Sequence, residues 1–390
     1  MLNKEDSRAP PPLFVSARLM VVVVKSNTTS SPLRFRVYGI RSDRVNLGRR
    51  SAYCSDYTHR SEFVYKAVVF ATTRVLELAK ESSTSIPSKY LRSDIEKAVV
   101  PNGDHIPEIP VIDMQKLVSV GPNNPEVEKL DFACKEWGFF QLVNHGVDSA
   151  LLENLKAEID AFFKLPMEEK KKWWQSPGNA EGFGQAFVVS DDQKLDWGDL
   201  FFMVTYPLRL RNPRLIPSLP SPLSELMECY TSELNNLSTG MLEKIAEALH
   251  MKPEEMTEFV GEGRQTIRIN CYPPCELSDQ VMELTPHSDA TLITILLQLN
   301  DVDGLEIRKD GKWYRSIEHC GTVHPVKERL SFAMFFGLGL DGELGPAPSL
   351  ISEQTPAKFK RVKVQEFYKG LFSRRLQGKA YVDTYKIQLD

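Results

Sequence analysis

Long hydrophobic runs are missing from this 390-residue sequence, and so is an excess of charge of one sign. The longest apolar run, Leu19 to Val24, is far too short to cross a bilayer, so we expect no membrane partner. The net charge is −4, and without a basic footprint we expect no nucleic-acid partner. What is present, 42% hydrophobic and 26% charged residues, is ordinary for a globular protein with a large core.

Cysteine is also scarce, with six residues scattered along the chain. This pattern favours a reducing compartment over a disulfide framework, and we expect the protein in the cytoplasm. Cys271 and Cys275 flank Tyr272-Pro273-Pro274 and offer a pair of zinc ligands. No second Cys/His pair at finger spacing follows, whereas structural zinc takes four ligands.

Residues 1–72 differ from the rest of the chain. They are rich in Ser, Thr, Arg and Pro and have no sustained apolar period, which predicts a disordered extension. An organelle transit peptide is the alternative, and Glu5 and Asp6 argue against it because such peptides are poor in acidic residues.

The remaining sequence places helices before strands. Residues 73–255 are predicted to be mainly helical, with a long helix from Leu223 to Met251. After Gly261 the apolar period changes to two, and residues 262–363 are predicted to form a β-sandwich or barrel. Residues 364–390 return to a helix and a tail. The strands expected in the second region are Thr266–Tyr272, Val281–Leu284, Ile293–Leu299, Leu305–Arg308 and Leu330–Phe336.

A possible metal site begins at the end of one of these strands. In an extended chain, residues i and i+2 point the same way, so His287 and Asp289 can present an imidazole and a carboxylate to one point. His319 offers a third ligand. Two histidines and one carboxylate on one face of iron(II) leave open positions for a 2-oxo acid and dioxygen.

Arg329 and Ser331 strengthen this interpretation. Arg329 lies on an apolar strand ten residues after His319, where an unpaired charge is costly. Its planar fork fits a carboxylate, and Ser331 shares its face of the strand. Tyr272 supplies a phenol from another strand. An ordinary surface salt bridge is the alternative role for Arg329.

These residues stand in a series of motifs that resembles the plant 2-oxoglutarate/Fe(II) dioxygenase superfamily, specifically its senescence-related and codeine O-demethylase-like branch. The resemblance runs from about Val75 to the C-terminus. The motifs are Ile109-Pro110-Val111-Ile112-Asp113, Trp137 to Gly146, Gly182-Phe183-Gly184, Asp196-Trp197, Asn270 to Cys275, Thr285 to Asp289, Ser316 to His319 and Glu328 to Ser331.

The resemblance implies an α+β chain with a double-stranded β-helix (jelly-roll) core behind a helical N-terminal region. It implies that His287, Asp289 and His319 bind Fe(II). It also implies that Arg329, Ser331 and Tyr272 anchor the distal carboxylate of 2-oxoglutarate, with Asn270 near the same site.

The implied reaction converts 2-oxoglutarate and O2 to succinate and CO2 while a small specialised metabolite is hydroxylated, demethylated or desaturated. Ascorbate is the expected reductant. The expected partner is a small molecule, and the expected oligomeric state is a monomer.

The chain departs from the family pattern between Asp289 and His319. Only the 29 residues from 290 to 318 separate them, and the family carries about one β-hairpin more, which we expect to be missing near 313–314. A catalytically impaired or non-catalytic relative is therefore an alternative. Leu292 and Cys320 also replace the Gly and Arg that are usual in the family.

A zinc hydrolase that uses the same three ligands is a further alternative. It requires a general base close to the metal, and Glu318 is expected to point away from it.

Overall fold

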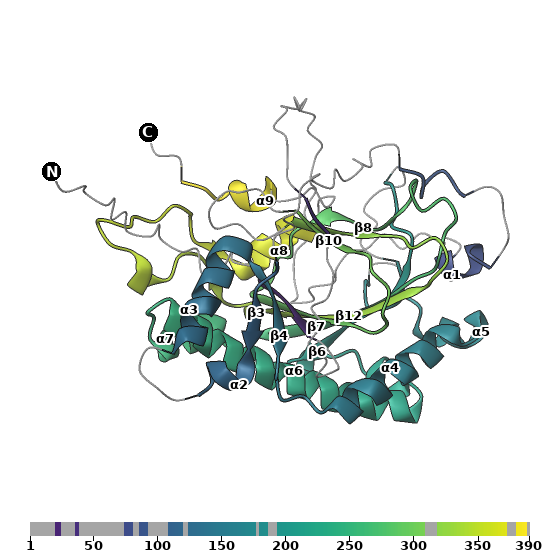
Figure 1. Cartoon of the computed structure of the whole chain (residues 1–390), viewed down its shortest axis with the longest axis horizontal. Coiled ribbons are helices and arrows are strands. Elements are labelled where there is room, and N and C mark those ends of the chain that lie inside the picture. Colours follow the sequence, from purple (N-terminus) through teal and green to yellow (C-terminus); the bar gives the residue numbers. More distant parts are fainter. Residues whose placement is uncertain are drawn as a thin grey trace, which may run out of the picture.

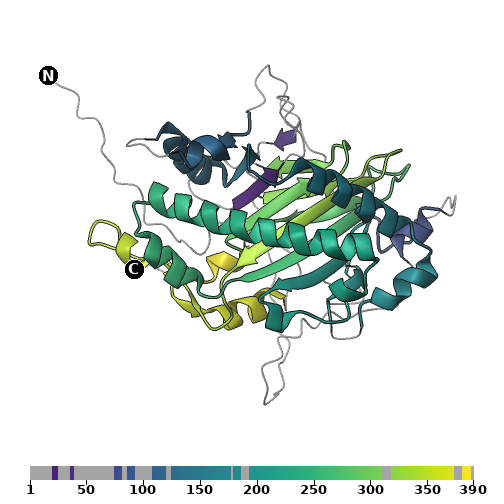
Figure 2. The same cartoon turned by 90° about the horizontal axis from the view of Figure 1, so that it is seen from below.

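The structure, a computed structural model, describes residues 20–24, 36–38, 74–80, 86–92, 108–119, 124–176, 179–185, 193–308, 318–372 and 380–387. Two β-sheets face each other, and helices α4 and α6 cover the outer face of the larger sheet (Figures 1 and 2). The helices are α1 Val75–Leu78, α2 Met114–Leu117, α3 Pro125–Phe132, α4 Ser149–Lys164, α5 Met167–Lys170, α6 Ser221–Ala248, α7 Pro253–Val260, α8 Val364–Phe372 and α9 Ala380–Asp383.

The larger sheet has eight strands and the smaller has four. The larger runs in the order β3 Val111–Asp113, β4 Phe139–Val143, β1 Met20–Val24, β9 Ile293–Gln298, β12 Arg329–Gly337, β7 Arg264–Tyr272, β6 Asp199–Tyr206 and β5 Gly182–Gly184. The smaller runs in the order β2 Arg36–Tyr38, β10 Leu305–Arg308, β11 Glu318–Thr322 and β8 Met282–His287. A separate pair joins β13 Glu343–Leu344 to β14 Val362–Lys363.

The main core lies between the helical layer and the larger sheet. Asp148 precedes helix α4 and caps it, because its side chain accepts a hydrogen bond from the backbone N–H of Ala150 at 2.8 Å. The apolar residues of α4 recur at steps of three and four and form one buried stripe. That stripe consists of Leu152, Leu155, Ile159, Phe162 and Phe163.

Strand β7 is buried along its whole length. It lies between β12 and β6, so both of its edges are hydrogen-bonded. Because its faces are also covered, polar residues on it lie inside the protein. This burial brings Asn270 and Tyr272 into the interior between the sheets.

Most predicted elements are found within a few residues of their expected bounds. Helix α6 begins two residues earlier than predicted because Pro222 fits its first turn. Strand β10 has the predicted bounds, whereas β6 and β11 were not predicted. The junction near 313–314 lies outside the described residues, as does the end of the predicted C-terminal helix after Phe372.

The expectation of disorder for residues 1–72 is wrong at the eight residues of β1 and β2. Strand β1 runs parallel to both β4 and β9 in the interior of the larger sheet. Strand β2 runs parallel to β10 at the edge of the smaller sheet. Composition over 72 residues could not predict this, because five apolar, mostly β-branched residues suffice for a strand once two neighbours supply its hydrogen bonds.

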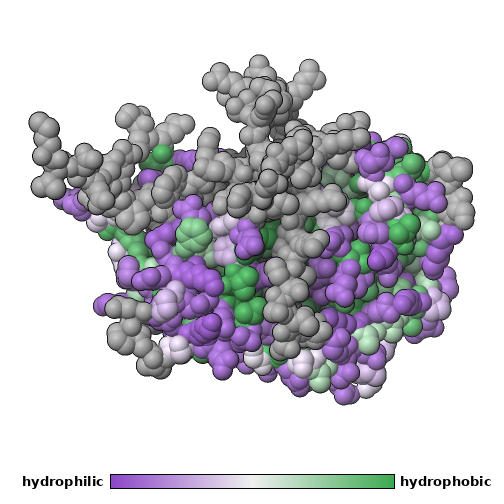
Figure 3. Space-filling view, in the orientation of Figure 1, coloured by the Kyte–Doolittle hydropathy of each residue, from purple (hydrophilic) through white to green (hydrophobic). Residues whose placement is uncertain are grey.

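No helix in the described ranges has the length and apolar character needed to span a bilayer. On the face drawn in Figure 3, hydrophilic residues predominate among the coloured atoms, and the apolar ones are scattered in small groups.

Candidate metal centre

His287, Asp289 and His319 come together between the two sheets. His287 ends β8, Asp289 follows in the next loop, and His319 lies on β11 directly opposite His287 in the strand register. The ligand atoms of the three residues all lie within 4.8 Å of one another. They form the only such group of three or more His, Cys, Asp or Glu residues within the ranges that the structure describes. The neighbouring antiparallel strands therefore supply the third ligand that the local spacing lacked.

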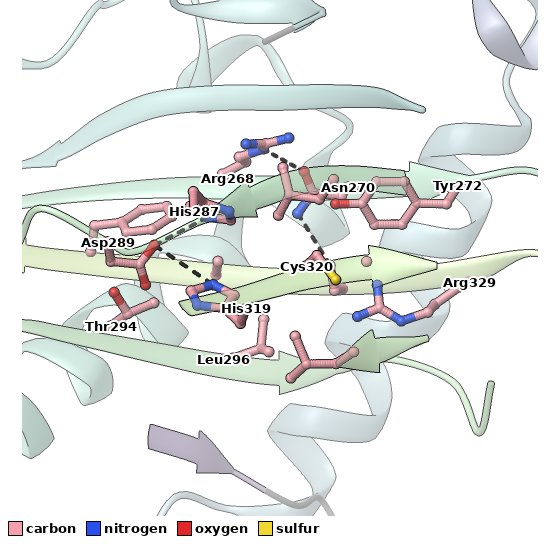
Figure 4. A pocket seen from close by; sticks show the side chains of 16 residues that line it. Arg268, Asn270, Tyr272, His287, Asp289, Thr294, Leu296, His319, Cys320 and Arg329 are labelled. Atoms are coloured by element: carbon pink, nitrogen blue, oxygen red, sulfur yellow. Dashed lines mark hydrogen bonds and ion pairs between the residues drawn. The ribbon is translucent and has the colours of Figure 1, made fainter. Parts of the chain in front are cut away.

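The three side chains converge on one oxygen (Figure 4). Asp289 Oδ1 lies 3.4 Å from Nε2 of His287 and 3.9 Å from Nε2 of His319. The two imidazole rings have centroids 4.4 Å apart. Both Nε2 atoms thus face the same carboxylate, as expected for two imidazole ligands of one metal ion.

The carboxylate of Asp289 suits a divalent cation. It is buried, and its second oxygen, Oδ2, has no hydrogen-bond partner. Burial alone raises the pKa of Asp289, but the charge of His319 and the hydrogen bond and charge of His287 outweigh it and hold the pKa well below its ordinary value. A buried anionic oxygen without a partner, beside two imidazoles, fits the donor set of a two-histidine, one-carboxylate iron site.

The other four predicted residues line the same pocket. Strands β12 and β7 pair so that Arg329 lies opposite Tyr272 and Ser331 lies opposite Asn270. The Asn270 side chain donates to the Ser331 hydroxyl at 3.1 Å, and the Arg329 guanidinium lies 5.4 Å from the centre of the Tyr272 ring. Burial raises the pKa of Tyr272 to about 12, so its phenol is protonated near neutral pH. Figure 4 places Arg329 across the pocket from Asp289.

Arg329 does not form the surface salt bridge considered as an alternative. Only 4% of its side chain is exposed, and its Nη1 donates to Oε2 of the equally buried Glu283 at 3.0 Å. The charge is therefore paired inside the protein, within reach of the pocket.

Two charged residues of this region were not predicted from the sequence. Arg268 lies on β7, lines the pocket and donates to the side chain of Asn270 at 2.5 Å. It stands two residues before Asn270 on a strand, which places both on one face and could have revealed it. Glu283 interrupts the apolar sequence of β8, and an acidic residue in a buried strand was the available signal.

The structure also places the residues at which this chain departs from the family pattern and those considered for zinc chemistry. Leu292 is buried in the main core and is not among the residues that line the pocket, whereas Cys320 does line it. Glu318 is absent from the pocket lining and lies 3.8 Å from Arg308. Cys271 and Cys275 are both free thiols, and the Cys271 thiol lies 3.2 Å from the Glu328 carboxylate.

Comparison with known sequence families identifies two matching regions. Residues 109–219 match the N-terminal region described as that of a non-haem dioxygenase in morphine synthesis. Residues 263–316 match the 2OG-Fe(II) oxygenase superfamily, and this match ends just before β11.

Individual relatives agree with these families. The chain is 50% identical to Protein SRG1 of Arabidopsis thaliana over 342 residues, which covers 80% of this chain and 96% of that protein. It is 44% identical to codeine O-demethylase of Papaver somniferum, covering 79% of this chain and 94% of that enzyme. The chain therefore belongs to the plant 2-oxoglutarate- and Fe(II)-dependent dioxygenases. It is an oxidoreductase of that class, with Fe(II) and 2-oxoglutarate as its cofactors.

Solved structures show the same fold. The structure of JOX2 in complex with 2OG, Fe and JA superposes on this chain with a TM-score of 0.72. The two sequences are 28% identical, and the match covers 82% of this chain and 99% of that one. The rice dioxygenase for auxin oxidation gives a TM-score of 0.61 at 19% identity, covering 72% of this chain and all of that one. The predicted α+β class and jelly-roll core are thus confirmed.

Proposed function

We propose that this chain oxidises a small specialised metabolite, by hydroxylation or O-demethylation, while 2-oxoglutarate and O2 are consumed. The observation that carries the proposal is the convergence of His287, Asp289 and His319 in a pocket between the sheets. Relatives named as flavonoid, codeine and thebaine O-demethylases support an aromatic or alkaloid substrate.

The proposed site divides into two ends. His287, Asp289 and His319 would hold Fe(II), which when bound supplies the activation of O2 and the oxidative decarboxylation of 2-oxoglutarate. At the other end, Arg329 and Ser331 would hold the distal carboxylate of 2-oxoglutarate.

The polar neighbours of Ser331 support its proposed role. Its oxygen accepts from Asn270, and Asn270 in turn accepts from Arg268. These two hydrogen bonds fix the position of the Ser331 oxygen. The hydrogen of the Ser331 hydroxyl then remains free to donate to a carboxylate. Protonated Tyr272 would donate from β7.

Apolar side chains complete the proposed pocket. Leu296, Leu305 and Phe335 line it beside the metal ligands. They would exclude water from the reaction and offer surface to an aromatic substrate. We also propose that the protein acts as a monomer. The free thiols of Cys271 and Cys275 support the cytoplasm as its location.

A catalytically impaired relative is the second candidate, and the short segment between Asp289 and His319 favours it. The alignment with SRG1 is 342 positions long, but it includes only 80% of the 390 residues of this chain. The other positions of the alignment are therefore gaps in this chain. This supports a core that lacks about one β-hairpin. We propose that β1 and β2, which pair with β9 and β10, cover the strand edges that such a loss would leave open.

A turnover experiment separates the two candidates. The full chain is supplied with Fe(II), ascorbate and 2-oxoglutarate labelled at C1. The CO2 released is counted in the absence of any metabolite substrate. If the site is active, we expect CO2 release well above background in wild type, and we expect this release to be abolished in His287→Ala. His250→Asn is the matched control, because His250 is exposed and its φ of 54° is tolerated by Asn.

The contrary result is background release from a chain that retains Fe(II) and is folded by circular dichroism. It would favour the impaired relative.

A further inference from the structure

Glu283 is a buried acidic residue beside the proposed cosubstrate site. It lies on β8, four residues before His287, and its side chain is fully buried. Its Oε2 accepts from Nη1 of Arg329 at 3.0 Å. Arg329 is the residue proposed to receive the distal carboxylate of 2-oxoglutarate, so a carboxylate of the protein already contacts the group that the cosubstrate needs.

The contact between Glu283 and Arg329 is incomplete. Neither Oε1 of Glu283 nor Nε of Arg329 has a hydrogen-bond partner, although both atoms are buried. A carboxylate that matched the arginine fork would accept two parallel N–H bonds. The pair therefore leaves Arg329 with unused donor capacity, which a second carboxylate can use.

Apart from Arg329, the charged group that acts on Glu283 is another acid, so the surroundings of Glu283 do not offset its negative charge further. Among the residues that the structure describes, Arg329 on β12 is the cation that acts on Glu283, while Glu306 on β10 repels it. Tyr272 on β7 is protonated, and Gly321 on β11, which lies against the Glu283 side chain, carries no charge. A 2-oxoglutarate carboxylate at Arg329 would thus become a second anion near one buried cation, which is costly in a medium of low dielectric.

We infer that Glu283 is an internal counter-ion of Arg329 that competes with the distal carboxylate of 2-oxoglutarate, and that the cosubstrate binds with uptake of a proton by Glu283. This inference rests on the proposed role of Arg329. Glu283 acts through Arg329 and is a positioning residue, since it does not line the pocket itself.

The charge state of Glu283 makes this competition relevant near neutral pH. Burial is the main influence on its pKa and raises it, Arg329 lowers it, and the result is a pKa of about 7. Above this pH the carboxylate is ionised and neutralises Arg329. Below it, Glu283 is protonated and Arg329 presents its full charge to the incoming carboxylate.

The first test measures affinity. 2-Oxoglutarate is titrated anaerobically into Fe(II)-loaded wild type, Glu283→Gln and the control Glu126→Gln, and the metal-to-ligand charge-transfer band is followed at pH 6 and pH 8. Gln keeps an acceptor for Nη1 without the charge. We expect Glu283→Gln to bind about tenfold more tightly than wild type at pH 8 and equally at pH 6. Glu126→Gln removes a buried carboxylate on α3 that accepts from the backbone N–H of Asp113 and does not line the pocket, and we expect no such tightening.

The second test starts from wild type, so its main result does not depend on the folding of a variant. Wild type is preloaded with Mn(II), so that the metal ligands no longer titrate, and 2-oxoglutarate binding is measured by calorimetry at pH 7.5 in two buffers of different ionisation enthalpy. Net proton uptake is expected in wild type and is expected to vanish in Glu283→Gln.

Binding without proton uptake, or weaker binding by folded Glu283→Gln at pH 8, would overturn the inference. Failure of the proposed function looks different, because wild type would then bind no 2-oxoglutarate in either experiment.

Discussion

The Nδ1 of His287 lies 2.8 Å from the backbone carbonyl oxygen of Thr285. A carbonyl oxygen only accepts, so Nδ1 carries a proton and donates, and a metal ion that replaced the proton on Nε2 would meet the Nε2 lone pair. Thr285 is itself fixed, because its N–H and its hydroxyl both donate to Oδ1 of Asp196, at 3.0 and 2.6 Å. Asp196 thus controls the orientation of His287, a proposed metal ligand, through the intervening residue Thr285.

Asp196→Ala should weaken Fe(II) binding by about 10- to 100-fold, because Thr285 and then His287 lose their fixed orientation. Metal affinity is measured by anaerobic Fe(II) titration. The control is Asp160→Ala, which removes a surface carboxylate that pairs with Lys164 on α4. If Asp196→Ala kept wild-type affinity, the orientation of His287 would not depend on this chain of hydrogen bonds.

Arg329→Lys should raise the dissociation constant of 2-oxoglutarate by about 10- to 100-fold while Fe(II) binding changes little. Lys keeps the charge but cannot form the two parallel N–H bonds that fit a carboxylate. The two affinities are measured separately, by metal titration and then by the charge-transfer band. Equal loss of both would indicate general unfolding, and loss of neither would remove Arg329 from the cosubstrate site.

Val22→Pro should lower the free energy of unfolding by about 3 kcal/mol or more, because proline cannot donate to a sheet ladder. Val22 lies in register with Phe140 on β4 and with Ile295 on β9, so both edges of β1 are paired. Urea unfolding of the full chain measures the change. Val22→Thr keeps the N–H and a β-branched side chain, and is the matched control.

If Val22→Pro were as stable as Val22→Thr, β1 would contribute nothing to the core, and the proposal that it covers the edge of β9 would fail.

Asp199 should make the stability of the protein fall as the pH rises from about 4 to about 6. It is buried and accepts the backbone N–H of Leu76 at 3.0 Å, and burial is the main influence that raises its pKa to about 6. In the unfolded chain its pKa is near 4. Between these values the folded state binds a proton that the unfolded state has lost. The stabilisation from that proton is complete below pH 4 and lost above pH 6.

The comparison is with Asp199→Asn, which does not titrate. Between pH 4.5 and pH 7, wild type should lose about 1 to 3 kcal/mol more unfolding free energy than the variant does. Urea unfolding at both pH values measures this difference. Parallel curves for the two proteins would show that Asp199 does not carry the expected shift.

The sequence by itself determined the features that depend on near neighbours in the chain. The long helix α6 and the bounds of β10 follow from local periodicity. The partnership of His287 and Asp289 follows from their spacing at a strand end, since residues two apart share a face. His319 could be nominated only because Arg329 and Ser331 follow it in a familiar order.

Only the tertiary structure decided which strands lie side by side. It placed His319 opposite His287, Ser331 opposite Asn270, and the acid Glu283 against Arg329. It also placed β1 and β2 in the two sheets, by parallel pairing with strands far along the chain. Local pattern cannot predict such pairing, because a strand's partner is set by which hydrogen-bonding edges and buried faces remain open once the rest of the chain has folded.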